Sequence, residues 1–300
     1  MFLVQVTDAI ILAGGIGTRM LPASLYSLKE GLPLVDTPIL NHLVWEAAKS
    51  GVSRIHIVLS KRKKKILEDF FQAGTVIDEG VRNDLPPESL RLGVPGVEII
   101  PHIQHESKGV GDAISTAMKN IKGPFLVLLG DMVLIEEHHD PSRSGVLYAS
   151  SASERLVESF KKSGLPCVGV FPVKLDEVCN YGVVGLNGEK IISIIEKPDP
   201  NDAPSNYVLC GRYLFPENTK QLLDKFPSSA YGELQSIIIL GHLIENSGLN
   251  AVKMDEMEMY DSGNPILWLK CQIDHSLRRK DLGSEMRMWL ARRLSQQEND

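Results

Sequence analysis

The sequence has little of three features that would each point to a particular class of protein. Only four cysteines occur among 300 residues, none in a Cys-x-x-Cys pair or near a histidine at zinc-ligand spacing. Lys and Arg number 32 against 38 Asp and Glu, and the net charge of -6 argues against a nucleic-acid-binding protein. No apolar run approaches the roughly 20 residues that span a membrane. We therefore expect a cytoplasmic protein without nucleic-acid or membrane partners, whose cysteines are buried, reduced thiols: Cys167, Cys179, Cys210 and Cys271.

What the sequence does contain is an alternation of apolar, strand-like runs with helical patterns, which predicts a parallel sheet with crossover helices. The long N-terminal runs lie at 9–13, 54–59, 97–103 and 125–129. Shorter runs, which indicate a mixed extension of the sheet, follow at 166–173, 181–186, 190–198 and 207–215. Helical patterns at 233–246 and 265–294 complete the chain. We predict the α/β class: a Rossmann-like, mixed, mostly parallel sheet flanked by helices, with a small β extension and C-terminal helices.

A glycine-rich loop follows the first predicted strand. Gly14, Gly15 and Gly17 let the backbone turn sharply and bring amide groups against phosphate oxygens. Arg19 adds a fork of donors suited to phosphate, and Lys29 adds a mobile point charge. The loop lacks the lysine of a P-loop, so it is not one. It also lacks the third glycine of the dinucleotide-binding fingerprint, and this argues against a nucleotide-sugar oxidoreductase. These residues predict a nucleoside triphosphate site.

The stretch from Asp8 to Pro33 resembles the signature of the sugar-1-phosphate nucleotidyltransferases, Gly-Gly-x-Gly-Thr-Arg-x-x-Pro followed by Lys-[Glu/Pro]-x-x-Pro. The resemblance runs through nearly the whole chain and is greatest to the bacterial and archaeal UTP-glucose-1-phosphate uridylyltransferases of this family. It implies a nucleotide-diphospho-sugar transferase fold. The nucleotide-binding residues that it implies are Leu12, Ala13, Gly14, Gly15, Gly17, Thr18, Gln104 and Gly109.

Two separated aspartates are candidate ligands of Mg²⁺. Asp131 follows a buried strand at its carboxyl end, where open α/β sheets place their ligands. Asp261 stands in an Asp-x-Gly that matches the family's second metal carboxylate. Magnesium is usually held by one or two carboxylates plus substrate phosphates. We expect Mg²⁺ as the cofactor.

Two further segments resemble the family's base and sugar pockets. Gln104 begins a stretch similar to the base-reading segment, and its amide can offer an acceptor and a donor to the imide edge of uracil. In the strand-like segment that ends at Lys197, the resemblance implies that Glu196 binds sugar hydroxyls and Lys197 the sugar phosphate. The sugar-side residues that it implies are Gly182, Glu196, Lys197, Leu209 and Glu233.

The resemblance implies that a hexose-1-phosphate, with glucose-1-phosphate expected, attacks the α-phosphorus of UTP and expels pyrophosphate. Lys29 and the magnesium would act at the α-phosphate, Arg19 on the pyrophosphate and Lys197 on the sugar phosphate. Leu25 is similar to the thymidylyltransferase branch, so dTTP in place of UTP stays open, as do another sugar-1-phosphate and a non-catalytic regulatory protein of the same fold.

The expected organisation is a catalytic domain over 1–262 followed by a C-terminal helical segment. The nucleotide half would cover about 1–135 and the sugar half about 136–262. The segment 263–300 would pack on the core or form the interface of a homo-oligomer.

The charged block Lys61–Lys65 is typical of a solvated helix start, with a second phosphate site as the alternative.

Overall fold

The computed structural model describes residues 5–63, 92–106, 108–136, 145–231 and 235–297. Within these residues the strands form a central nine-stranded sheet and two small ribbons. The ribbons are β2 (Pro33–Leu34) with β3 (Thr37–Pro38), and β7 (Met132–Ile135) with β13 (Glu258–Asp261). From edge to edge, the central strands are β5 (Glu98–Gln104), β4 (Arg54–Ser60), β1 (Asp8–Leu12), β6 (Phe125–Leu129), β11 (Tyr207–Phe215), β8 (Cys167–Pro172), β12 (Asn250–Lys253), β10 (Lys190–Glu196) and β9 (Gly182–Asn187).

The sheet is mixed, as predicted. Pairing is parallel between β5, β4, β1 and β6, and also between β8 and β12. Strands β11 and β10 run antiparallel to the strands that pair with them. The α/β class and the mixed sheet are confirmed. The prediction that the sheet is mostly parallel is not, because four of the strand pairings in it are parallel and five are antiparallel.

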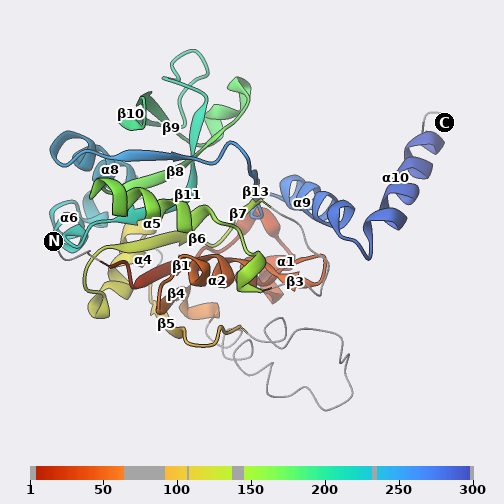
Figure 1. Cartoon of the computed structure of the whole chain (residues 1–300), viewed down its shortest axis with the longest axis horizontal. Helices are drawn as coiled ribbons and strands as arrows, with labels where there is room; N and C mark the ends of the chain where they lie inside the picture. Colours follow the sequence, from red (N-terminus) through yellow and green to blue (C-terminus); the bar gives the residue numbers. More distant parts are fainter. Residues whose placement is uncertain (1–4, 64–91, 107, 137–144, 232–234, 298–300) are drawn as a thin grey trace.

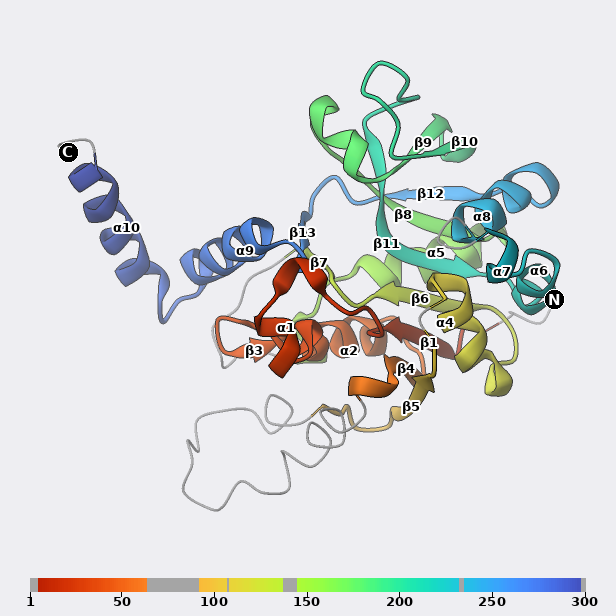
Figure 2. The same ribbon diagram turned by 180° about the vertical axis from the view of Figure 1, so that it is seen from behind.

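Helices cover both faces of the sheet, as Figures 1 and 2 show. Because alternate side chains of a strand point to opposite faces, Ile11 of β1 packs in one hydrophobic cluster and Ile10 in the other. The cluster around Ile11 includes α2 (Ile39–Lys49) and α5 (Ala152–Ser163). The cluster around Ile10 includes α4 (Val110–Ala117), α6 (Thr219–Lys225) and α8 (Gln235–Asn246). The short helices are α1 (Ala23–Tyr26) and α7 (Ser228–Tyr231).

The ribbon of β7 and β13 brings together two distant parts of the chain. Met132 pairs with Asp261, and the amide and hydroxyl of Ser262 donate to the Asp131 carbonyl at 2.7 and 2.9 Å. The two candidate metal carboxylates therefore lie close together, with Asp131 immediately before β7 and Asp261 at the end of β13. The sequence analysis did not predict this ribbon, since its strands are only four residues long.

A buried ion pair fixes the start of β7. The guanidinium of Arg212 donates to both carboxylate oxygens of Glu46, at 2.7 and 2.8 Å, and to the carbonyl of Met132 at 3.0 Å. Arg212 is 1% exposed and Glu46 2% exposed, so the pair is shielded from water. The hydrogen bonds of Arg212 thus connect α2 and β11 to β7, the strand that follows Asp131.

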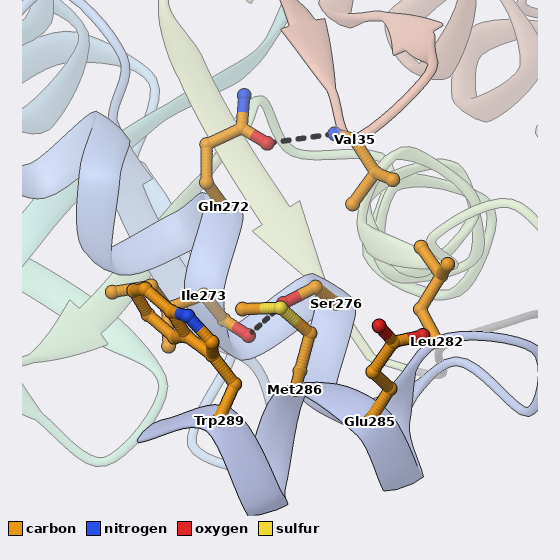
Figure 3. Close-up of a pocket in the computed structure, with 8 residues that line it drawn as sticks. All are labelled: Val35, Gln272, Ile273, Ser276, Leu282, Glu285, Met286 and Trp289. Carbon is orange, nitrogen blue, oxygen red and sulfur yellow. Dashed lines mark hydrogen bonds between the residues drawn. The ribbon is translucent and has the colours of Figure 1, made fainter. Parts of the chain in front are cut away.

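The C-terminal segment consists of two helices, α9 (Pro265–Arg278) and α10 (Gly283–Gln297). The sequence pattern at 265–294 had predicted a single helix there. The helix is interrupted at Arg279, which has an extended backbone and pairs with Asp36 at 2.7 Å and Asp281 at 2.6 Å. Helix α9 packs on the body of the molecule through the buried Cys271 and through hydrogen bonds of Gln272 with the backbone of Pro33 and Val35, whereas α10 extends away from it (Figures 1 and 2). Figure 3 shows the cavity of about 500 Å³ between them, where Trp289 and Met286 of α10 face Ile273 of α9.

The cysteines are free thiols, but one of them is not buried. Cys167, Cys210 and Cys271 are buried, and burial raises the pKa of each of these thiols to about 12. Cys179 is exposed, contrary to the prediction, because the turn after β8 that carries it lies at the surface. No helix in the described parts of the chain is long and apolar enough to cross a membrane.

Candidate active site

The glycine loop lies between β1 and the next helical turn and closes over the side chain of Lys29. Gly17 has φ +72°, and a Cβ added there would lie 3.3 Å from Cδ of Lys29. A Cβ on Gly15 would lie 3.3 Å from Nζ of Lys29. Glycine therefore suits position 17 for its backbone conformation, and positions 15 and 17 for the close approach of the Lys29 side chain, with its ammonium beside Gly15.

A cavity of about 470 Å³ lies beside this loop. Its lining includes most of the predicted nucleotide residues together with Lys29 and Asp131: Leu12, Gly14, Gly15, Gly17, Thr18, Lys29, Gln104, Gly109 and Asp131. Ala13 lies beneath the loop, fully buried, and its amide donates to the Val58 carbonyl at 2.8 Å. The structure thus brings together residues from the first 131 positions at the carboxyl ends of β1, β5 and β6.

Two acids and two cations converge beside the cavity. Nζ of Lys29 lies 2.5 Å from Oδ2 of Asp131, and Nη2 of Arg19 lies 2.9 Å from Oδ2 of Asp261. A Cβ added to Gly263 would lie 2.9 Å from Asp261 Oδ1, 3.1 Å from Arg19 Nη2 and 3.2 Å from Asp131 Oδ2. Both aspartates and Arg19 therefore meet at the bare backbone of Gly263.

This pair of carboxylates fits a hard divalent cation that is bound partly by the protein and partly by the phosphate oxygens of a substrate. The carboxylates of Asp131 and Asp261 offer the oxygen ligands that Mg²⁺ prefers. Among the described residues, no group of three or more histidine, cysteine, aspartate or glutamate side chains could hold a metal. An ion at this place would thus take its remaining ligands from phosphate oxygens and water.

A second, buried layer of charge lies beneath Lys29. Glu30 is fully buried, and its carboxylate lies 3.0 Å from Nζ of Lys63 and 3.8 Å from Nζ of Lys29. Lys63 also donates to the carbonyl of Ala13 at 3.2 Å. The prediction that Lys61–Lys65 is solvated is wrong at Lys63, which is 5% exposed because Glu30 and the loop carbonyl draw it inward. Lys64 and Lys65 lie outside the described residues.

The pKa shifts follow from this burial. Burial alone would lower the pKa of Lys29, but the carboxylates of Asp131 and Glu30 outweigh it, so the pKa of Lys29 is raised. Burial raises the pKa of Glu30 against the opposing charges of Lys63 and Lys29. Burial likewise lowers the pKa of Lys63 against the attraction of Glu30. Lys29 is therefore the cation that stays protonated at the cavity wall.

The predicted base-reading residues line the same cavity, and Gln104 lies next to Gly14 of the glycine loop. Gln104 ends β5 and is 6% exposed. Its amide nitrogen donates to Oδ2 of Asp112 at 2.6 Å and to the Gly109 carbonyl at 3.5 Å. Gly109 has φ +94° and immediately precedes α4. Asp112 could not be identified from the sequence, because nothing in its local pattern signals a contact with Gln104.

The predicted sugar-side residues come together around Gly182. A Cβ on Gly182 would lie 3.1 Å from both Glu196 Oε2 and Leu209 Cδ1. Lys197 has φ +46°, and its amide donates to the Tyr181 carbonyl at 2.9 Å, while its ammonium lies 3.6 Å from Glu196 Oε1. Glu233 lies outside the described residues. Three separate strands thus supply this cluster.

The pKa of Tyr181, the residue that precedes β9 beside the sugar cluster, responds to the charges of Asp261 and Arg19. Burial raises the pKa of its phenol, and the negative charge of Asp261 raises it further, whereas Arg19 acts in the opposite direction. The start of β9 therefore lies within electrostatic range of the Asp261–Arg19 pair.

Comparison with known proteins gives consistent matches over most of the chain. The family model described as "Nucleotidyl transferase" matches residues 8–271. A relative from Haemophilus influenzae, named UTP–glucose-1-phosphate uridylyltransferase, is 31% identical over 294 residues, which cover 94% of this chain and 97% of the relative.

Solved structures agree with the sequence matches. A UTP-bound UGPase from Acinetobacter baumannii has a TM-score of 0.79 and 26% identity, with 96% of this chain and 99% of that chain covered. A UDP-glucose pyrophosphorylase complexed with UDP-glucose has a TM-score of 0.75 and 27% identity, with 89% of this chain and 97% of that chain covered.

Proposed function

The chain belongs to the nucleotidyl transferase family, and on that premise we propose that it forms UDP-glucose and pyrophosphate from UTP and glucose-1-phosphate. The names of its relatives support the choice of substrates. The observation that carries the proposal is the meeting of Asp131, Asp261 and Arg19 at Gly263, beside a glycine-loop cavity walled by Lys29.

The reaction needs no protein nucleophile. A phosphate oxygen of glucose-1-phosphate forms a bond to the α-phosphorus of UTP, and the bond from that phosphorus to the bridging oxygen of the β-phosphate breaks. The attacking oxygen is already an anion, so no general base has to take a proton from it. Catalysis then consists of aligning two anions and neutralising the charge of the transition state.

Each cation of the site has a place in this scheme. Lys29, protonated and held at the cavity wall, neutralises charge at the α-phosphate. Arg19, whose side chain is 58% exposed, can turn from Asp261 toward the departing pyrophosphate. Lys197, equally exposed, binds the phosphate of the sugar. The exposure of both side chains supports these roles, because little packing has to be broken when they move.

Asp131 and Asp261 would hold Mg²⁺. When bound, the ion would neutralise charge on the phosphates and fix their orientation. The nearness of Asp131 to Lys29 supports this assignment, because Lys29 and an ion held by Asp131 would act on the same phosphate group.

The residues of the sugar cluster support a hexose as the sugar of the substrate. Glu196 offers two acceptors to hydroxyl groups, and Gly182 leaves room for a ring against the backbone. The division into a nucleotide half at about 1–135 and a sugar half at about 136–262 remains part of the proposal. A thymidylyltransferase remains the second candidate, because Leu25 matches that branch of the family.

We further propose a cytoplasmic homo-oligomer in which 263–300 contributes to the interface. The exposed apolar side chains of α9 and α10 support this, with Ile266 at 58%, Met288 at 61% and Leu294 at 62% exposure. Light scattering of the native protein and of a Met288→Lys, Leu294→Lys double variant tests it. We expect the double variant to have the smaller mass, and a native monomer would contradict the proposal.

The proposed reaction is tested by incubating the protein with UTP, glucose-1-phosphate and Mg²⁺ and following pyrophosphate and UDP-glucose together. Both products should appear in equal amounts, and neither without the sugar phosphate. Omission of the protein and replacement of UTP by dTTP, CTP, ATP or GTP complete the screen. Nucleotide binding without product would support the non-catalytic alternative.

A further inference from the structure

Gln104 lies against two acceptors on one side and the nucleotide cavity on the other. Rotating its terminal amide by half a turn would exchange a donor for an acceptor at the cavity. The partners of the amide decide which orientation is held. These partners are the Asp112 carboxylate, at 2.6 Å from Nε2, and the Gly109 carbonyl, at 3.5 Å.

Neither partner can donate a hydrogen bond. An ionised carboxylate and a backbone carbonyl only accept, so both require the NH₂ end of the Gln104 amide. The bond to Asp112 is the shorter one and involves a charged acceptor, which makes it the stronger constraint. If the amide were reversed, its oxygen would face two acceptors in a site where Gln104 is only 6% exposed.

The acceptor end of the amide faces the glycine loop. A Cβ added to Gly14 would lie 3.0 Å from Oε1 of Gln104, and both residues line the nucleotide cavity. Among the described residues, no donor is paired with Oε1. The group that Gln104 offers to the base is therefore a fixed acceptor, and its donor is already in use.

We propose that Asp112 is a positioning residue that selects the base: it holds the Gln104 amide so that Oε1 accepts the N3–H of uracil or thymine. Cytosine has an acceptor at N3, so Oε1 would face it without a hydrogen bond. This inference rests on the proposed function, because it explains how the same nucleotide site chooses among pyrimidines. It changes the expectation from sequence, in which Gln104 used both its donor and its acceptor on the base.

A purely structural role for Asp112 makes a different prediction. Asp112 lies in the first turn of α4, where a negative charge stabilises the helix dipole. In that role its removal would lower stability and affect every nucleotide alike. A change in the ratio between two nucleotides separates the two roles.

The test compares kcat/KM for UTP, dTTP and CTP in the native protein and in Asp112→Asn, each with glucose-1-phosphate. Asparagine keeps the size of the side chain but offers both a donor and an acceptor, so the Gln104 amide can turn over. We expect the UTP to CTP ratio to fall about tenfold or more. The UTP to dTTP ratio should not change, because both bases carry the N3–H.

The matched control is Glu98→Gln, which removes the same charge from the opposite, exposed end of β5. It should leave both ratios at their native values. Asp112→Ala serves as a second variant in case Asp112→Asn does not fold, and should lower the UTP to CTP ratio in the same way. In a Gln104→Ala background, Asp112→Asn should have no further effect on the ratio, since it acts only through Gln104.

The outcomes separate this inference from the proposed function. A native protein that makes UDP-glucose, with an Asp112→Asn variant that keeps the native UTP to CTP ratio, overturns the inference alone. Failure of the proposed function would appear in the native protein, as absence of UDP-glucose formation. An equal fall for UTP, dTTP and CTP in Asp112→Asn would assign Asp112 a structural role and also overturn the inference.

Discussion

Nζ of Lys29 lies 2.5 Å from Oδ2 of Asp131, although 102 residues separate the two in the chain. The second carboxylate of the site is paired in the same manner, with Arg19 at 2.9 Å from Asp261. Each acid is therefore neutralised by a cation before any substrate enters. In the proposed reaction, the phosphates of the substrates and a divalent ion would take over these partners.

Loss of either aspartate should stop turnover. In Asp131→Asn or Asp261→Asn we expect kcat to fall about a hundredfold or more, with a higher Mg²⁺ requirement, because one carboxylate remains for the ion. The two effects should not add in the double variant. Initial rates across a magnesium titration measure this, and full activity of either variant at ordinary magnesium would refute the metal assignment.

Lys197 should affect the sugar phosphate and not the nucleotide. Lys197→Ala removes an exposed ammonium whose nearest carboxylate is 3.6 Å away, so the fold should be unaffected. We expect KM for glucose-1-phosphate to rise about tenfold or more, with KM for UTP nearly unchanged. Lys190→Ala, at the other end of β10, is the control. An unaltered KM for glucose-1-phosphate would remove Lys197 from the site.

The buried charges below the loop should matter for stability. Lys63→Met leaves Glu30 with one fewer partner in a fully buried position, and we expect a loss of about 3–5 kcal/mol in the free energy of unfolding. Lys61→Met, at the exposed start of the same charged block, should change it by less than about 0.5 kcal/mol. Urea denaturation measures both, and equal effects would show that Lys63 is not held by Glu30.

The sheet should lose stability in acid through Asp8. Burial alone would raise the pKa of Asp8, but its bonds to His56 and Arg54 outweigh this, so the pKa lies below the ordinary 3.8. A carboxylate with a depressed pKa stabilises the fold above its unfolded pKa, and this stability is lost as pH falls through the folded pKa. Asp8→Asn should therefore be less stable than the native protein at neutral pH, and the difference should shrink below about pH 4. Urea midpoints at several pH values test this, and a constant difference would contradict it.

The parts of the site that the sequence predicted lie in continuous motifs next to strands. Gly14, Gly15, Gly17 and Lys29 could be identified because their chemistry and spacing are local. Asp131 could be identified because a buried strand ends two residues before it. The strand positions of the central sheet followed from apolar runs in the same way, except for the four-residue strand β12, which was not predicted.

The parts that the sequence did not predict depend on distant partners. Lys63 stands in a block of like charge, and only the position of Glu30 shows that it is buried. The pair of Arg212 with Glu46 joins residues 166 positions apart, and no local pattern signals it. In the sequence, Asp112 is an ordinary acidic residue in the first turn of a helix. Only the structure shows that Gln104, at the end of β5, lies beside it.

The most direct test of the proposed reaction follows the α-phosphorus of UTP. The protein is incubated with glucose-1-phosphate and UTP labelled either at the α-phosphate or at the β- and γ-phosphates. The account predicts that the α-label appears in UDP-glucose and the other label in pyrophosphate, at equal rates and only when glucose-1-phosphate is present. Release of the α-label as UMP, or transfer of the γ-label to the sugar phosphate, would contradict it.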